Sequence, residues 1–221
     1  MKKGYYLKIA GCLFILSIFS LSCSKKDDSS INARISDFVG KVLISGSADI
    51  KTGRAIIFGD IIETGEKSSC DILINEKNIL KINQNTRLVF NISSESNVLQ
   101  VETGWFAAIT KQPFTKQMHY IIKSPTLVAA VRGTSFCMKV ENPQSTYFCV
   151  CNGSIELKEP DDKTGDIVVS AHHSARRYIK GKDGKITIEK NPGLLYHNDQ
   201  GIEDMAKKIN VTIDWKQPDN K

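Results

Sequence analysis

Residues 70–90 read CDILINEKNILKINQNTRLVF, and this stretch decides the fold class. Three short apolar runs, Asp71–Ile74, Ile79–Ile82 and Arg87–Phe90, are separated by polar residues. In the first run Cys70, Ile72 and Ile74 alternate with residues that face the other way, as in a strand with one buried face. No helical period runs through the segment. We predict consecutive short β-strands.

The same pattern extends outward between residues 39 and 157. Further runs of this type are Val42–Ile44, Ala55–Phe58, Val98–Val101 and Trp105–Ile109. Glycines fall between or within the runs, where turns or bulges need a positive φ or a close backbone approach. The spacing suits a sandwich or a solenoid-like stack of strands, and periodicity does not choose between them.

Several phrases within this region recur in a known family. In chain order they are Phe58–Gly65, Val101–Trp105, Ser124–Thr126, Val131–Phe136 and Cys151–Leu157. Together they resemble the FecR domain, which would occupy residues 36–158. The resemblance implies a mainly β, twisted, β-solenoid-like fold and an envelope module. FecR-type regulators carry a cytoplasmic anti-sigma region before a transmembrane helix; only 22 residues precede Cys23 here, so we expect that region to be lacking.

The N-terminus has the pattern of an export signal. Lys2 and Lys3 precede an apolar run at residues 9–19, too short for a permanent span, and small residues follow. Ser22 and Cys23 resemble the end of a bacterial lipobox, although Leu21 stands one place late. We predict a signal peptide at 1–22, a lipid on Cys23 and a flexible tether at 23–35; an ordinary cleaved signal is the alternative.

The predicted location is the cell envelope, outside the cytoplasm. Ser24 after the lipidated cysteine favours the outer membrane over the inner one, by resemblance to known sorting. The formal charge is +6, and three lysines would leave with the signal, so the mature charge would be near +3. This weak excess favours no nucleic-acid partner.

Four cysteines remain in the predicted mature domain: Cys70, Cys137, Cys149 and Cys151. Thiols tend to pair in an oxidising compartment, and four allow three connectivities. If the chain turns near Pro143, residues whose numbers sum to 286 face each other. Cys137 would then lie opposite Cys149, where a disulfide is possible.

A second set of residues could bind metal. Cys149 and Cys151 share one face of a strand, and three histidines follow in the C-terminal third: His172, His173 and His197. Thiolate and imidazole suit zinc or copper. Only one of the adjacent histidines could join the cysteines directly. The spacing fits no familiar zinc module, and buried structural thiols with solvated histidines are the alternative.

Residues 159–221 change character and are predicted to form a hairpin and a short helix. Lys182–Lys185 is a hairpin-type turn. Within 198–210, Ile202, Met205 and Ile209 have helical spacing.

No G-x-S-x-G or H-E-x-x-H motif occurs, so we expect no enzyme. The sequence predicts a lipid-anchored binding, scaffold or accessory signalling module, with an envelope protein or cell-wall material as partner. The alternative is a metal- or redox-sensing envelope protein. No cofactor is expected other than zinc or copper.

Overall fold

The structure is a computed structural model, and it describes residues 1, 31–93, 95–111 and 120–219. Apart from Met1, the predicted signal peptide lies outside these residues, as does Cys23. No helix in the described part is long and apolar enough to cross a membrane.

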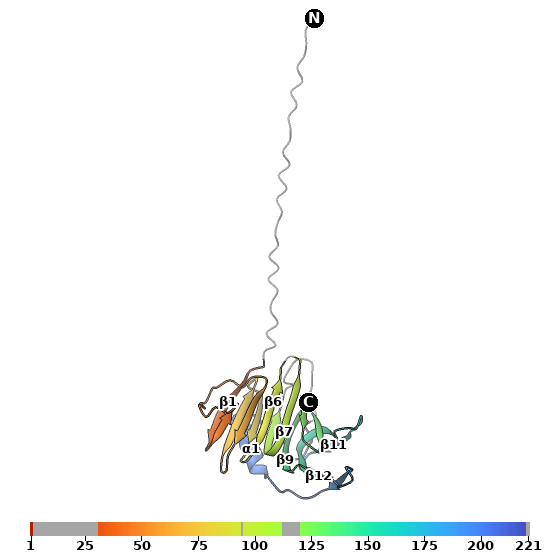
Figure 1. The fold of residues 1–221 in the computed structure, drawn as a ribbon. Coiled ribbons are helices and arrows are strands. Elements are labelled where there is room, and N and C mark those ends of the chain that lie inside the picture. Colours follow the sequence, from red (N-terminus) through yellow and green to blue (C-terminus); the bar gives the residue numbers. More distant parts are fainter. Residues whose placement is uncertain (2–30, 94, 112–119, 220–221) are drawn as a thin grey trace.

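The described chain forms one twisted sheet and one helix (Figure 1). The elements are β1 (Ala33–Val39), β2 (Val42–Ile44), β3 (Asp60–Thr64), β4 (Ser69–Ile74), β5 (Asn78–Ile82), β6 (Arg87–Ile92), β7 (Asn97–Thr110), β8 (Tyr120–Lys123), β9 (Val128–Asn142), β10 (Ser145–Lys158), β11 (Asp166–Ser170), β12 (Ser174–Lys180), β13 (Ile186–Lys190) and α1 (Asp199–Lys208). The expected mainly β fold with a C-terminal hairpin and helix is confirmed. β1 begins at Ala33, within the stretch expected to be tether.

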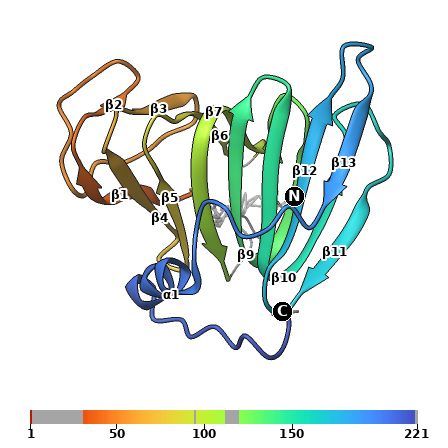
Figure 2. The same ribbon diagram turned by 90° about the horizontal axis from the view of Figure 1, so that it is seen from below.

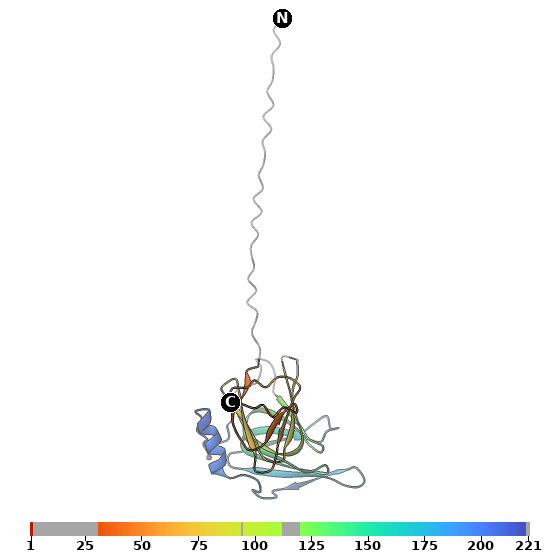
Figure 3. The same cartoon turned by 60° about the vertical axis from the view of Figure 1, so that its left-hand side comes forward.

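Neighbouring strands are antiparallel except for the pair β7 and β8. The main path runs β1-β4-β5-β7-β8-β9-β10-β12-β13. This pairing gives a curled, open sheet and does not show the repeating coils of a solenoid. Figure 3 shows the strands wrapping around an interior, with α1 on the outside.

Two long strands change partners at a glycine. The first half of β7 pairs with β6 and the second half with β5 and β9. Gly104 lies at the change with φ +85°, and a Cβ there would meet Thr86 Oγ1 at 2.2 Å. Gly153 (φ +122°) lies where β10 changes from β12 to β11. Both sites require the positive φ that glycine tolerates.

The sheet has two apolar faces. The inner face, which we call the main core, includes Ile72, Phe106, Phe136 and Phe148. The outer face, which we call the covered face, includes Ile79, Ile109 and Tyr147 and lies under α1. Figure 2 shows α1 and the chain after it running along one side of the sheet.

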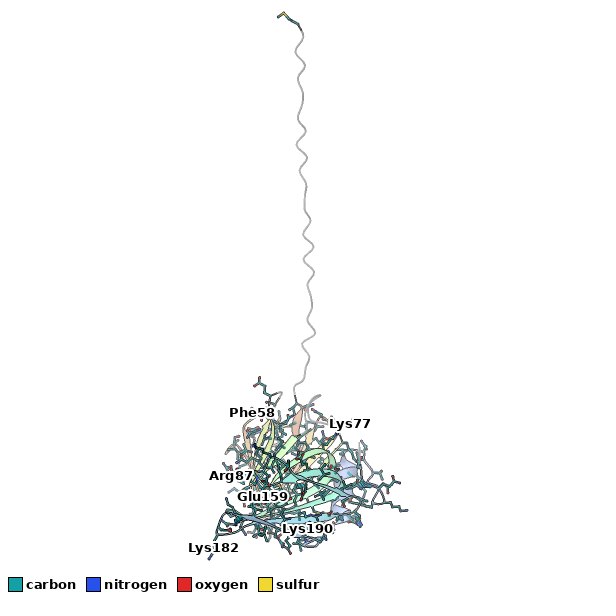
Figure 4. The ribbon with its side chains drawn as sticks, turned by 90° about the vertical axis from the view of Figure 1, so that its right-hand side faces the viewer. Phe58, Lys77, Arg87, Glu159, Lys182 and Lys190 are labelled. Carbon is teal, nitrogen blue, oxygen red and sulfur yellow. The ribbon has the colours of Figure 1, made fainter. Side chains whose placement is uncertain are left out.

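The molecule has two distinct ends along the strands. Figure 4 places Phe58 and Lys77 at the end where the described chain begins, and Lys182 at the opposite end. Hydrogen bonds agree with this arrangement: the amide of Ile56 donates to the carbonyl of Ala33 at 2.9 Å. Phe58 is exposed on the turn that follows.

Candidate functional site

The candidate site begins on β10, which lies inside the sheet. Its residues pair with β9 on one side and with β12 or β11 on the other. Cys149 and Cys151 are fully buried on the covered face. Alternate residues of a strand share a face, and the predicted common orientation of the two side chains is confirmed.

His173 reaches this pair from the turn between β11 and β12. The chain turns there, and His173 has a left-handed φ of +55°. Its amide donates to the carbonyl of Cys151 at 2.9 Å. Non-glycine residues are uncommon in this region of φ, but histidine adopts it more readily than most. The turn brings His173 Nδ1 to 3.7 Å from Cys149 Sγ.

His197 comes from the other side, immediately before α1. Its Nε2 lies 3.1 Å from Cys151 Sγ and 3.3 Å from His173 Nδ1. The following residue, Asn198, caps the helix by accepting a hydrogen bond from the amide of Gly201 at 2.8 Å. The cap fixes the start of the helix, and with it the position of His197.

The four ligand atoms form a compact group. The two Sγ atoms, His173 Nδ1 and His197 Nε2 all lie within 4.8 Å of one another. In a tetrahedral zinc site with Zn–S of about 2.3 Å and Zn–N of about 2.0–2.1 Å, ligand atoms are about 3.3–3.8 Å apart. The separations of 3.1, 3.3 and 3.7 Å given above are close to this range. Two sulfurs and two imidazole nitrogens therefore fit one ion.

Asp199 supports His173 from behind. The Nε2 atom of His173 lies 2.7 Å from Asp199 Oδ1, so the ring turns Nδ1 towards the cysteines. A carboxylate on the far nitrogen is the usual support of a metal-binding histidine, because it fixes the tautomer and orientation. His172 is half exposed and contacts the other oxygen of Asp199 at 3.0 Å. The structure therefore joins His173 to the cysteines and leaves His172 outside.

Trp215 packs against the two adjacent histidines. Its ring centroid lies 5.0 Å from that of His172 and 5.2 Å from that of His173. Its Nε1 donates to Glu203 of α1 at 2.9 Å, which holds the indole in place. Neither Asp199 nor Trp215 was a predicted site residue. Asp199 was recognisable only as an acidic residue at a helix start, and nothing in the sequence linked Trp215 to the histidines.

The pKa values of the two cysteines are shifted in opposite directions. Hydrogen bonding, first with Cys151 and then with His173 and His197, holds the pKa of Cys149 well below its usual value despite burial. Burial raises the pKa of Cys151. Burial lowers the pKa of His173, but hydrogen bonds to Cys149 and Asp199 raise it more. The site thus favours a thiolate at Cys149, which is the form of cysteine that binds a metal ion.

Cys137 lies next to the site on β9. It is paired with Cys149 across the two strands, so the predicted register is confirmed. Both residues are free thiols in the structure, and their disulfide stays a prediction. Cys70 belongs to the main core instead, and burial raises its pKa to about 12.

Part of the chain is similar to known proteins. No curated protein matches it. Two crystal structures of a proposed anti-sigma factor from Parabacteroides distasonis ATCC 8503, at 1.65 and 2.50 Å resolution, are similar, with 16% and 15% identity and TM-scores of 0.47. Each alignment covers 70% of this chain and 80% of the other. Residues 60–156 match the model of the FecR protein family.

The family match spans β3 to β10 and includes both cysteines of the site. His173, His197 and α1 lie beyond it. The expected resemblance is confirmed over residues 60–156, which match the FecR protein family.

Proposed function

We propose that this protein is a lipid-anchored, non-enzymatic FecR-domain protein of the cell envelope that binds one metal ion through Cys149, Cys151, His173 and His197. The observation that carries the proposal is the convergence of four ligand atoms within 4.8 Å. Nδ1 of His197 is buried without a hydrogen-bond partner in the described structure, so the Nε2 contacts and the ring contact with His173 orient the imidazole. Electron-rich sulfur and nitrogen atoms that converge in this way are stabilised by a cation.

Zinc is the preferred ion, and Cu(I) is the alternative. Two cysteines and two histidines fill a tetrahedral shell, which is typical of structural zinc sites that leave no position for substrate. Soft thiolates also suit Cu(I). A closed shell supports a sensing or structural role rather than catalysis.

The predicted disulfide would compete with the ion. Cys149 cannot be both a thiolate ligand and half of a disulfide with Cys137. Metal binding and oxidation would therefore exclude each other, and the reduced protein is the form to test.

Metal analysis of the reduced, mature protein tests the proposal. After zinc loading and dialysis, we expect about one equivalent of zinc in the wild type and little in Cys151→Ser or His197→Ala. Cys70→Ser and His172→Ala are matched controls, since each removes the same kind of group outside the ligand set. A wild type that retains no zinc or copper would refute the metal site.

The lipid anchor has its own test. Cells labelled with radioactive palmitate should incorporate label into the wild type and not into Cys23→Ala. Fractionation of the labelled cells then tells whether the outer membrane holds the protein, as the residue after Cys23 predicts. Equal labelling of both forms would refute the anchor.

A second candidate function is protein binding at a strand edge. Among the described strands, β11 pairs only with β10, and two of its apolar side chains, Ile167 and Val169, are 72% and 54% exposed. Open edges with apolar residues pair readily with another chain. Crosslinking in intact envelopes should recover a partner that is lost in Val169→Lys and kept in Lys182→Glu.

A further inference from the structure

The proposed ligands come from two different parts of the molecule. Cys149, Cys151 and His173 belong to the sheet and its turn, whereas His197 belongs to the segment that ends the chain. We call residues 193–219 the C-terminal cover. Asp199, the first residue of α1, makes the same connection, since it contacts both His172 and His173. An ion at this site would join the cover to the sheet.

The cover hides apolar surface that belongs to the sheet. Ile202, Met205 and Ala206 of α1 are buried against it, together with Ile209 and Ile213. Beneath them lie Ile79 of β5, Ala107 and Ile109 of β7, and Cys137 of β9. Figure 2 shows the path of the cover along this side. Without the cover, the face would be exposed to water.

The cover is also attached to the sheet by polar contacts at several other points. The Tyr147 hydroxyl donates to the carbonyl of Gly193 at 2.9 Å, and Lys208 lies 2.6 Å from the buried Asp71. Asn152 Nδ2 donates to the carbonyls of Asp214 and Gln217, each at 2.9 Å. A helix of ten residues is marginal by itself in water. Docking of α1 therefore depends on the sum of these contacts and on whatever holds its first turn.

We propose that the metal ion fastens the C-terminal cover, so that metal occupancy determines how firmly the covered face is closed. This inference rests on the proposed metal site. Binding one ion requires His197 to stay beside Cys151. Because the next residue, Asn198, caps α1, the ion would also hold the first turn of α1 in place. Loss of the ion leaves the start of the helix held by weaker contacts, such as those of Asp199 with the two histidines and of Tyr196 with Glu141. The face then opens more often and becomes available to other molecules.

Hydrogen–deuterium exchange of the full mature chain, reduced, with and without zinc, tests this directly. We expect amides of α1 to exchange at least about tenfold faster in the zinc-free protein, while amides in the middle of β9 stay unchanged. The same loss of protection is expected for His173→Ala with zinc present. His172→Ala should keep zinc-dependent protection of α1.

A reciprocal measurement avoids removing any ligand. If the ion holds the cover, weakening the cover must weaken ion binding by the same factor. Met205→Ser should raise the zinc dissociation constant by about tenfold, measured by competition with a chelator. Lys207→Ser carries the same new residue at an exposed position of α1 and should leave the constant unchanged.

The outcomes separate this inference from the metal site itself. If the wild type binds one zinc and α1 exchanges equally with and without it, the cover is not fastened by the ion, although the site stands. Equal zinc affinities for Met205→Ser and Lys207→Ser would likewise overturn the fastening and leave the site intact. If zinc does not bind at all, the metal site fails and this inference fails with it.

Discussion

The main core and the covered face of the same sheet are closed in different ways. Around the main core, strands that follow one another in sequence curl over their own apolar side chains. The covered face is closed by a segment from the far end of the chain, and it contains the Cys and His side chains of the site. The main core is therefore closed mainly by apolar packing within the sheet, and the covered face by packing together with polar and ionic groups. Four predictions test this difference.

The largest expected effect is in the main core. Phe136 is fully buried, with ring centroids of Phe106 and Phe148 at 5.7 and 5.3 Å. Phe136→Ala should lower the free energy of unfolding by about 3–5 kcal/mol. Ile202→Ala, in the cover, should lower the free energy of unfolding by only about 2 kcal/mol, because α1 can move towards the sheet and reduce the cavity. Urea unfolding followed by circular dichroism measures both, and equal losses would contradict the comparison.

The second prediction is a gain in thermal stability when zinc binds at the covered face. Zinc at about one hundred times its dissociation constant should add about 2.7 kcal/mol to the free energy of unfolding. For a chain of this size, that gain raises Tm by about 5–10 °C. Chelation should remove that gain in the wild type, and Cys151→Ser should show no response to zinc or chelator. Cys70→Ser, whatever its own Tm, should keep the full response. Differential scanning calorimetry under reducing conditions measures these shifts.

Sequence reasoning succeeded where contacts are local or follow strand register. The alternation around Cys70 predicted strands, and the turn near Pro143 predicted that Cys137 faces Cys149. The spacing of Ile202, Met205 and Ile209 predicted α1. Each signal lies within a few residues, or follows from the pairing of two adjacent strands.

The assembled site was less predictable for a physical reason. His197 meets Cys151 across 46 residues, after a loop with no periodic pattern. His173 points to the cysteines because its turn adopts a left-handed φ, a conformation that no local sequence pattern predicted. The candidate residues could be named from their chemistry. Their arrangement depends on where the cover docks, which only tertiary packing decides.

The third prediction concerns the start of the cover, where Tyr196 contacts Glu141, and it has a pH signature. Burial raises the pKa of Glu141, but hydrogen bonds from Ser145, Tyr196 and Arg177 lower it more, so the net shift is below the usual 4.5. The carboxylate therefore stabilises the fold above its unfolded pKa, and this contribution is lost as pH falls through the folded pKa. Glu141→Gln should cost about 1–2 kcal/mol at pH 7.

Urea unfolding between pH 7 and pH 3 checks the sign. The wild type should lose stability below about pH 5 more steeply than Glu141→Gln does. Glu66→Gln, at an exposed position, is the matched control and should follow the wild type. Parallel curves for the wild type and Glu141→Gln would show that Glu141 does not link Tyr196 of the cover to the sheet.

The smallest expected effect is at the end of α1 opposite the metal site. Lys208 contacts Asp71, which is 2% exposed, and Asp37, which is exposed. Lys81 also contacts Asp71 at 3.3 Å, so Lys208→Ala leaves the buried carboxylate with a partner. The expected loss is below about 1 kcal/mol and should shrink as salt is added.

Lys207→Ala is the control, because its contact with Asp204 lies at the surface of the same helix. If the ion dominates docking, Lys208→Ala should speed exchange of α1 amides clearly only in zinc-free protein. An equal effect with and without zinc would mean that the two ends of α1 are held independently. The covered face would then be closed by its separate contacts, as the main core is by its own packing, and not through the ion.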